Sequence, residues 1–120
     1  MENKIRLRSL SKRTDFENLR AVGLTFHVNS WLLANMYKTD AGEVRLGWTI
    51  ARQIGSAVVR NRLRRWGREF LRQWSVNKNI SLDLNLIFKR REKSFFKALS
   101  HEDFDGAMEK LVARIERESQ

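Results

Sequence analysis

The chain contains no cysteine, no proline and only two histidines among its 120 residues. Without cysteine there can be no disulfide scaffold, no thiolate nucleophile and no cysteine-ligated zinc, and His27 and His101 are the only imidazole ligands. No apolar run approaches the roughly 18 residues of a membrane span, and residues 1–13 lack the apolar centre of a signal peptide. We therefore expect a cytoplasmic protein with no membrane contact.

Acidic residues are also scarce relative to basic ones. The chain has 14 Asp and Glu against 24 Lys and Arg, a net charge of +10 and a sequence pI of about 10.9. A hydrophobic fraction of 42%, with seven Phe and four Trp, can build a core, so the charge does not indicate a disordered tail. The length suits a single domain over residues 1–120, and nucleic acid is the usual partner of so basic a domain.

Signatures of catalysis by the protein are missing as well. The sequence has no P-loop, no G-x-G-x-x-G and no carboxylates of the two-metal kind, and neither histidine has a nucleophile motif beside it. Glu102, Asp103 and Asp105 lie close together, but acids at this spacing are better explained as the first turn of a helix. The sequence therefore predicts no catalytic residue, no metal site and no cofactor in the protein itself.

What is present indicates an α/β fold, an α+β sandwich. Thr14 and Glu17 have the spacing of a capping box and precede a short amphipathic pattern that stops at Gly23. This pattern predicts a first helix over residues 14–22. A short additional strand is possible near residues 25–28.

Three further segments have the composition of strands. Residues 31–37 and 44–51 are rich in aromatic and branched side chains and flank a turn-like tetrad at 39–42, which predicts a hairpin. Residues 82–88 alternate apolar and polar side chains in their first half, as a half-exposed strand would. The expected order is helix, strand, strand, helix, strand, helix, with the possible extra strand before the hairpin.

The strongest periodic signal runs from Gly55 to about Trp74 and predicts a long helix. At about 100° per residue its side chains divide into two arcs. The apolar arc holds Val59, Leu63, Trp66, Phe70 and Trp74, and the other arc holds Arg60, Asn61, Arg62, Arg64, Arg65, Arg68 and Arg72. Only Glu69 lies among these arginines, so we expect an external polyanion to compensate their mutual repulsion.

The last helix is predicted to begin at Ser100, whose spacing from Asp103 is that of an N-cap and an acidic first turn. Its core stripe should consist of Phe104, Ala107, Met108, Leu111, Val112 and Ile115. Net charge is negative over residues 100–120 but positive over 1–20, 52–72 and 89–93. We therefore expect the basic segments to form the partner surface and the last helix to face elsewhere.

The run from Gly55 to Arg72, with Arg60-Asn61-Arg62 inside it, resembles the RNR signature of the bacterial ribonuclease P protein component. The frame around it agrees with that family in Arg6-Leu7, Asp15-Phe16, Gly23, Arg45-Leu46-Gly47 and the apolar strand that Asp83 leads. The resemblance covers residues 6–115. It implies an α/β sandwich with a left-handed βαβ crossover around the arginine helix, an exception to the usual right-handed rule.

The resemblance also implies function. In this family a catalytic RNA subunit cleaves the 5′ leader from precursor tRNA, with magnesium expected in the RNA, and no protein partner is implied. The residues that would bind the RNA subunit are Arg60, Asn61, Arg62, Arg64, Arg65, Arg68 and Arg72. The residues that would lie along the leader are Phe16, Arg20, Met36 and Arg52.

Three positions depart from the family pattern. Arg20 stands where a second aromatic residue usually follows Phe16, and Ala34 stands where the first long strand often has an aromatic. Gln53, after Ala51 and Arg52, removes one of two usual positive charges before the signature. These departures predict changed leader contacts and unchanged RNA-subunit contacts.

Charge geometry alone leaves other interpretations open. A ribosomal protein or RNA chaperone could use the same arginine helix, and a DNA-binding module could insert it in a groove. Groove reading is less favoured, because only Asn61 and Gln73 on the exposed arc could read bases. A nuclease that cleaves without an RNA partner is a third alternative.

Overall fold

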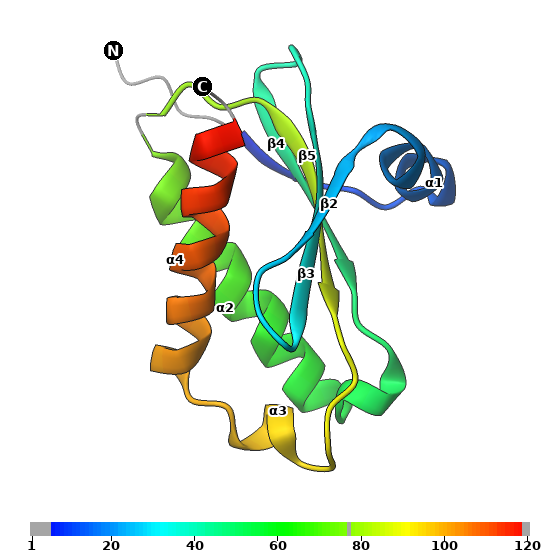
Figure 1. The fold of residues 1–120 in the computed structure, drawn as a ribbon, viewed down its shortest axis with the longest axis vertical. Coiled ribbons are helices and arrows are strands. Elements are labelled where there is room, and N and C mark those ends of the chain that lie inside the picture. Colours follow the sequence, from blue (N-terminus) through cyan, green and yellow to red (C-terminus); the bar gives the residue numbers. More distant parts are fainter. Residues whose placement is uncertain (1–5, 77, 119–120) are drawn as a thin grey trace.

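The computed structural model describes residues 6–76 and 78–118. Its elements are β1 (Arg6–Ser9), α1 (Arg13–Val22), β2 (Leu24–His27), β3 (Leu32–Lys38), β4 (Glu43–Thr49), the 3-10 turn η1 (Arg52–Ile54), α2 (Ala57–Ser75), β5 (Leu82–Phe88), α3 (Phe95–Ala98) and α4 (His101–Glu118). The five strands form one sheet, with α1 on one face and α2 and α4 on the other (Figure 1). The predicted α+β sandwich is confirmed.

The strand order β1-β4-β5-β3-β2 shows that the predicted hairpin was wrong. β5 lies between β3 and β4, antiparallel to the first and parallel to the second. The chain between β3 and β4 instead crosses the start of β5, where Thr39 Oγ1 lies 2.8 Å from Ser81 Oγ and the Gly42 amide donates to the same oxygen at 2.9 Å. The actual hairpin is formed by β2 and β3.

Helix α2 connects two adjacent parallel strands, β4 and β5, so the βαβ unit that the resemblance implies is present. Strand β1, which pairs parallel with β4 at one edge of the sheet, was not predicted. β5 is central and not half-exposed: even Asn85 is only 5% exposed, because strands lie on both sides and helices cover both faces. No described helix is long and apolar enough to cross a membrane.

Alternation along the strands gives the sheet one apolar and one polar face. Leu82, Leu84, Leu86 and Phe88 of β5 are buried in the core that α2 and α4 complete. The residues between them face α1 with their register neighbours, and this polar face includes Asp83, Asn85, Arg45, Gly47, Asn35 and Tyr37. The polar face is therefore available for a site beside α1.

Helix α2 is buried over a wider arc than its apolar stripe predicts. Val59 and Leu63 are buried as expected, but Gly67, Leu71 and Ser75 are also buried, on the arc that turns toward Arg60 and Arg64. The aromatic part of the predicted stripe, Trp66, Phe70 and Trp74, is only partly buried. The reason is that α2 contacts both the sheet and α4. At Gly67 the approach is so close that a Cβ atom would lie 2.5 Å from Trp48 Cη2.

The start of α4 was predicted correctly, but the start of α1 was not. For α4, the Asp103 amide donates to Ser100 Oγ at 3.0 Å, and all six residues of the predicted core stripe are buried. For α1, the predicted capping box is wrong: the helix begins at Arg13 after Lys12, and no side chain caps it. The short helix α3 was not predicted.

Candidate nucleic-acid interface

Helix α2 begins at Ala57, two residues after Gly55, and Ser56 is its N-cap. Ser56 Oγ accepts a hydrogen bond from the Val59 amide at 3.3 Å, which satisfies one of the free amides of the first turn. Arg60 Nε donates to the carbonyl oxygen of Gly55 at 3.2 Å. The first arginine of the motif is thereby anchored to the start of its own helix.

The remaining arginines, apart from Arg62, extend along the solvent side. Arg65 and Arg72 are exposed, and Arg64 and Arg68 are half-buried. Arg64 Nη1 donates to Asn61 Oδ1 at 2.9 Å, so Asn61 orients a neighbouring guanidinium. Among the described residues, no salt bridge reaches any arginine of α2. The helix therefore presents positive charge that the described part of the protein leaves uncompensated.

Arg62 is an exception within the motif. Its Nη2 donates to the carbonyl oxygens of Phe96 at 2.8 Å and Lys97 at 3.1 Å, and its guanidinium lies 4.9 Å from the Trp66 ring centroid. The same Trp66 ring also stacks on His101, with ring centroids 4.5 Å apart and an angle of 5° between the ring planes. Arg62 is thus bound to α3, and His101 belongs to an aromatic stack. Among residues 6–76 and 78–118, no cluster of side chains could hold a metal ion.

The basic segment that follows β5 lies at the same end of the sheet as η1. β4 and β5 are parallel, with Thr49 beside Ile87, so their carboxyl ends place Arg52 and segment 89–93 near the start of α2 (Figure 1). Arg91 is occupied, because it donates to Ser30 Oγ at 2.8 Å and covers the Phe95 ring. Arg90, Lys93 and Arg52 are exposed and extend the positive surface of α2.

The four predicted leader residues do not share one surface. Phe16 of α1 is half-buried against the polar face of the sheet, where a Cβ on Gly47 would lie 2.7 Å from its Cε1. Arg20 is exposed on the same helix. Met36 is only 3% exposed and belongs to the core on the opposite face of the sheet, so its prediction as a leader-binding residue is wrong. Neighbouring Asn35 is on the α1 side, because a shift of one residue along a strand reverses the face.

The same reversal applies to Ala34, which is fully buried in the core and cannot mark a missing leader contact. Sequence reasoning also missed what holds α1 in place. Arg45 Nε and Nη2 donate to the two carboxylate oxygens of Asp83 at 2.8 and 2.7 Å, and Asp15 of α1 lies 3.6 Å from Arg45 Nη1. The hydrogen bonds from Arg45 to Asp83 raise the pKa of the arginine, which stays charged. Both residues stood out as family markers, but only the fold shows that they meet.

The fold and the positive helix together define a class of protein, a small α+β domain that presents a basic surface to nucleic acid. A family model, Ribonuclease P, matches residues 4–116, and the chain belongs to the ribonuclease P protein family. It is 37% identical over 82 residues to the ribonuclease P protein component of Desulfosudis oleivorans, covering 68% of this chain and 67% of the relative. It is 28% identical over 111 residues to that of Clostridioides difficile, covering 92% and 94%.

Solved structures agree with the family assignment. The ribonuclease P protein of Thermotoga maritima aligns with a TM-score of 0.69 at 30% identity, over 93% of this chain and 97% of that one. The protein of Staphylococcus aureus aligns with a TM-score of 0.77, over 92% and 96%; at 17% identity this likeness concerns the fold alone.

Proposed function

We propose that this protein is the non-catalytic subunit of a ribonuclease P, in which a catalytic RNA removes the 5′ leader of precursor tRNA. The observation that carries the proposal is the row of α2 arginines, within the family motif, that lack carboxylate partners among the described residues. Arginine forks bind phosphate in two-point contacts, so a row of them suits the backbone of a folded RNA. The basic residues beyond β4 and β5 lengthen this contact surface.

The leader would occupy the polar face of the sheet beside α1. Phe16 is half-buried against Gly47, and an aromatic side chain that is only partly buried can stack on a base. Arg20 lies on the same helix and supplies a charge for the leader backbone. In this arrangement α2 and α1 bind different RNA segments on opposite faces of one sheet.

Phosphodiester hydrolysis would be performed by the RNA, with magnesium held in the RNA partner. The protein residues described above bind and orient, and none of them is assigned a proton transfer. Adding the cognate RNA to the protein should give specific cleavage at the mature 5′ end, whereas the purified protein alone should not cleave at any magnesium concentration. Specific cleavage by the protein alone would overturn this division of labour.

Copurification identifies the partner directly. The tagged full-length protein should retain one structured RNA of a few hundred nucleotides, which sequencing would identify as the RNA subunit. Association with whole ribosomes would instead favour a ribosomal protein. Preferential retention of duplex DNA would favour a DNA-binding module.

A further inference from the structure

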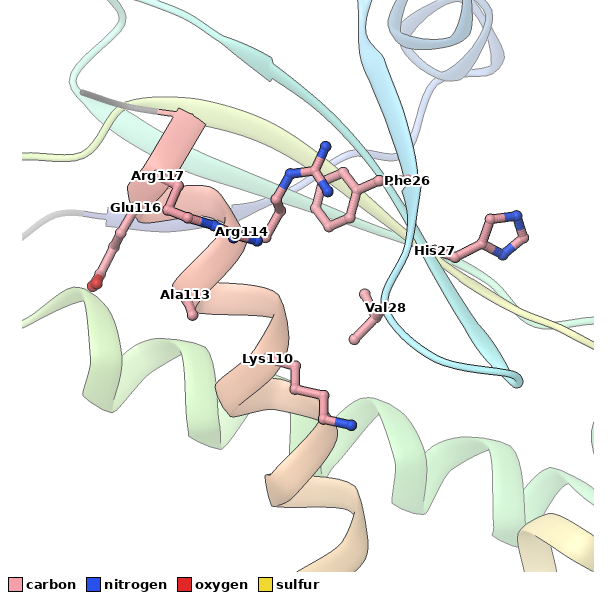
Figure 2. Close-up of a pocket in the computed structure, with 8 residues that line it drawn as sticks. All are labelled: Phe26, His27, Val28, Lys110, Ala113, Arg114, Glu116 and Arg117. Atoms are coloured by element: carbon pink, nitrogen blue, oxygen red, sulfur yellow. The ribbon is translucent and has the colours of Figure 1, made fainter.

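A second basic surface contains no residue of α2. It is a groove of about 540 Å³ between the edge strand β2 and the outer side of α4 (Figure 2). Its lining includes Phe26, Val28, Lys110, Ala113, Arg114 and Arg117. From its net negative charge, α4 was expected to take no part in binding a polyanion.

The cations of α4 are all on the groove side. Lys110, Ala113, Arg114 and Arg117 have the spacing of one helical stripe, with the small Ala113 at its centre. Glu116 also lines the groove, but its carboxylate is engaged elsewhere, because Oε1 accepts hydrogen bonds from Trp74 Nε1 at 2.9 Å and Lys78 Nζ at 3.0 Å. These bonds lower the pKa of Glu116 and engage its charge on the α2 side. The groove is therefore basic although the helix as a whole is acidic.

Arg114 is held in a fixed orientation at the upper end of the groove. Its guanidinium carbon lies 4.6 Å from the Phe26 ring centroid, and its Nε donates to Glu118 Oε1 at 2.8 Å (Figure 2). The side chain remains 34% exposed. Because the side chain is still partly exposed, the guanidinium can be reached from solvent while it covers the Phe26 ring, and guanidinium planes stack on nucleic-acid bases.

Lys110 and Arg117 flank this position. Both are exposed, and within the described part of the chain neither takes part in a salt bridge or side-chain hydrogen bond. They are seven residues apart, which places them roughly 10 Å from each other along the helix axis. Two free cations on either side of a stacking surface match a nucleotide chain, in which phosphates alternate with bases.

We propose that the groove between β2 and α4 binds a short segment of single-stranded RNA. One base would stack on the outer face of Arg114, and the adjoining phosphates would contact Lys110 and Arg117. This site goes beyond the proposed function, because it is separate from both α2 and the leader surface beside α1. An acidic peptide fits less well, since it would use the charges but not the fixed guanidinium plane.

The test is a nuclear magnetic resonance titration of the isotope-labelled full chain with an oligouridylate of about ten nucleotides. Resonances of α1, α2 and the groove report the three surfaces separately. Amides of Val28 and Ala113 should shift in a saturable way. If only α1 and α2 resonances move, the groove proposal is wrong while the proposed function is unaffected.

Two substitutions that preserve charge distinguish a specific RNA-binding site from nonspecific electrostatic attraction. Arg114→Lys keeps the charge but removes the plane, and it should weaken binding at the groove about tenfold. Arg117→Lys is the matched control and should change binding less than about twofold, because either cation contacts a phosphate. Ala113→Phe should fill the groove and weaken binding as much as Arg114→Lys.

Equal affinity of all three variants and the parent chain would overturn the proposal. So would an oligoglutamate that shifts Val28 and Ala113 as strongly as the oligouridylate, because that result identifies an acidic chain as the occupant. Arg114 and Ala113 both lie at the protein surface, so the circular dichroism spectrum of each variant should match that of the parent chain.

Discussion

Arg62 reaches from the middle of the arginine motif to the end of α3, where its Nη2 donates to the Phe96 carbonyl oxygen at 2.8 Å. The last carbonyl groups of a helix have no partners within the helix, so this arginine supplies what α3 lacks. α3 follows the basic segment 89–93, and Arg62 therefore fixes that segment relative to α2. Arg62 is thus bound to another element of the protein, whereas Arg64, Arg65, Arg68 and Arg72 extend along the solvent side.

This relationship predicts that Arg62 and Arg65 have different roles. Arg62→Ala removes the two bonds to α3 and should lower the free energy of unfolding by about 1–3 kcal/mol. Amide hydrogen exchange in residues 95–98 should accelerate with it. Arg65→Ala, at an exposed position of the same helix, should change stability by less than about 0.5 kcal/mol. The idea fails if the urea denaturation midpoint and α3 protection of Arg62→Ala equal those of the parent chain.

Reversing the charge of two solvent-facing arginines of α2 tests whether this helix binds the RNA subunit. Arg65→Glu combined with Arg68→Glu should weaken RNA-subunit binding by several kcal/mol, because two contacts are lost and two repulsions are created. Binding isotherms at several salt concentrations should also show a slope of log affinity against log salt that is shallower by about 2 units, since one phosphate contact contributes about 0.9. A folded double variant with the parent affinity would show that this arc is not the contact.

Phe16 tests the leader surface. Phe16→Ala should reduce holoenzyme affinity for precursors with long leaders by about 1–3 kcal/mol if the ring stacks on a base, and should leave precursors with one- or two-nucleotide leaders nearly unchanged. The measurement compares parent and variant holoenzymes on both substrates. An equal loss on both would mean that Phe16 serves only to pack α1 on Gly47.

Two helical glycines make a matched pair for stability. Gly67→Ala places a methyl group against the Trp48 ring and should destabilise the protein by about 1–3 kcal/mol, despite the better helix propensity of alanine. Gly106→Ala places its new carbon more than 4 Å from every atom outside the neighbouring backbone of α4 and should stabilise this helix by about 0.5–1 kcal/mol. Thermal unfolding of both variants provides the comparison. A Gly67→Ala protein as stable as Gly106→Ala would contradict the close approach of α2 to β4.

Local features of the protein could be predicted from the amino-acid sequence alone. Periodicity located α2 and α4, Ser100 marked a helix start, and the alternation of polar and apolar residues located β5. The motif identified the family, and the charge arithmetic indicated a polyanionic partner. These properties depend on neighbouring residues within a few turns, so a linear pattern is enough to predict them.

The pairing of the strands and the face that each side chain occupies depend instead on tertiary packing. The turn at 39–42 was recognised, but a turn does not state whether a third strand enters between its arms, and β5 does. Met36 was assigned to the wrong side of the sheet, since one residue of offset reverses the face. Arg62 was grouped with the solvent-facing arginines because a helical wheel shows only the residues of one helix and cannot show a contact with α3. Its partners are 34 and 35 residues away in the chain, and long-range contacts of this kind are fixed by packing and not by local pattern.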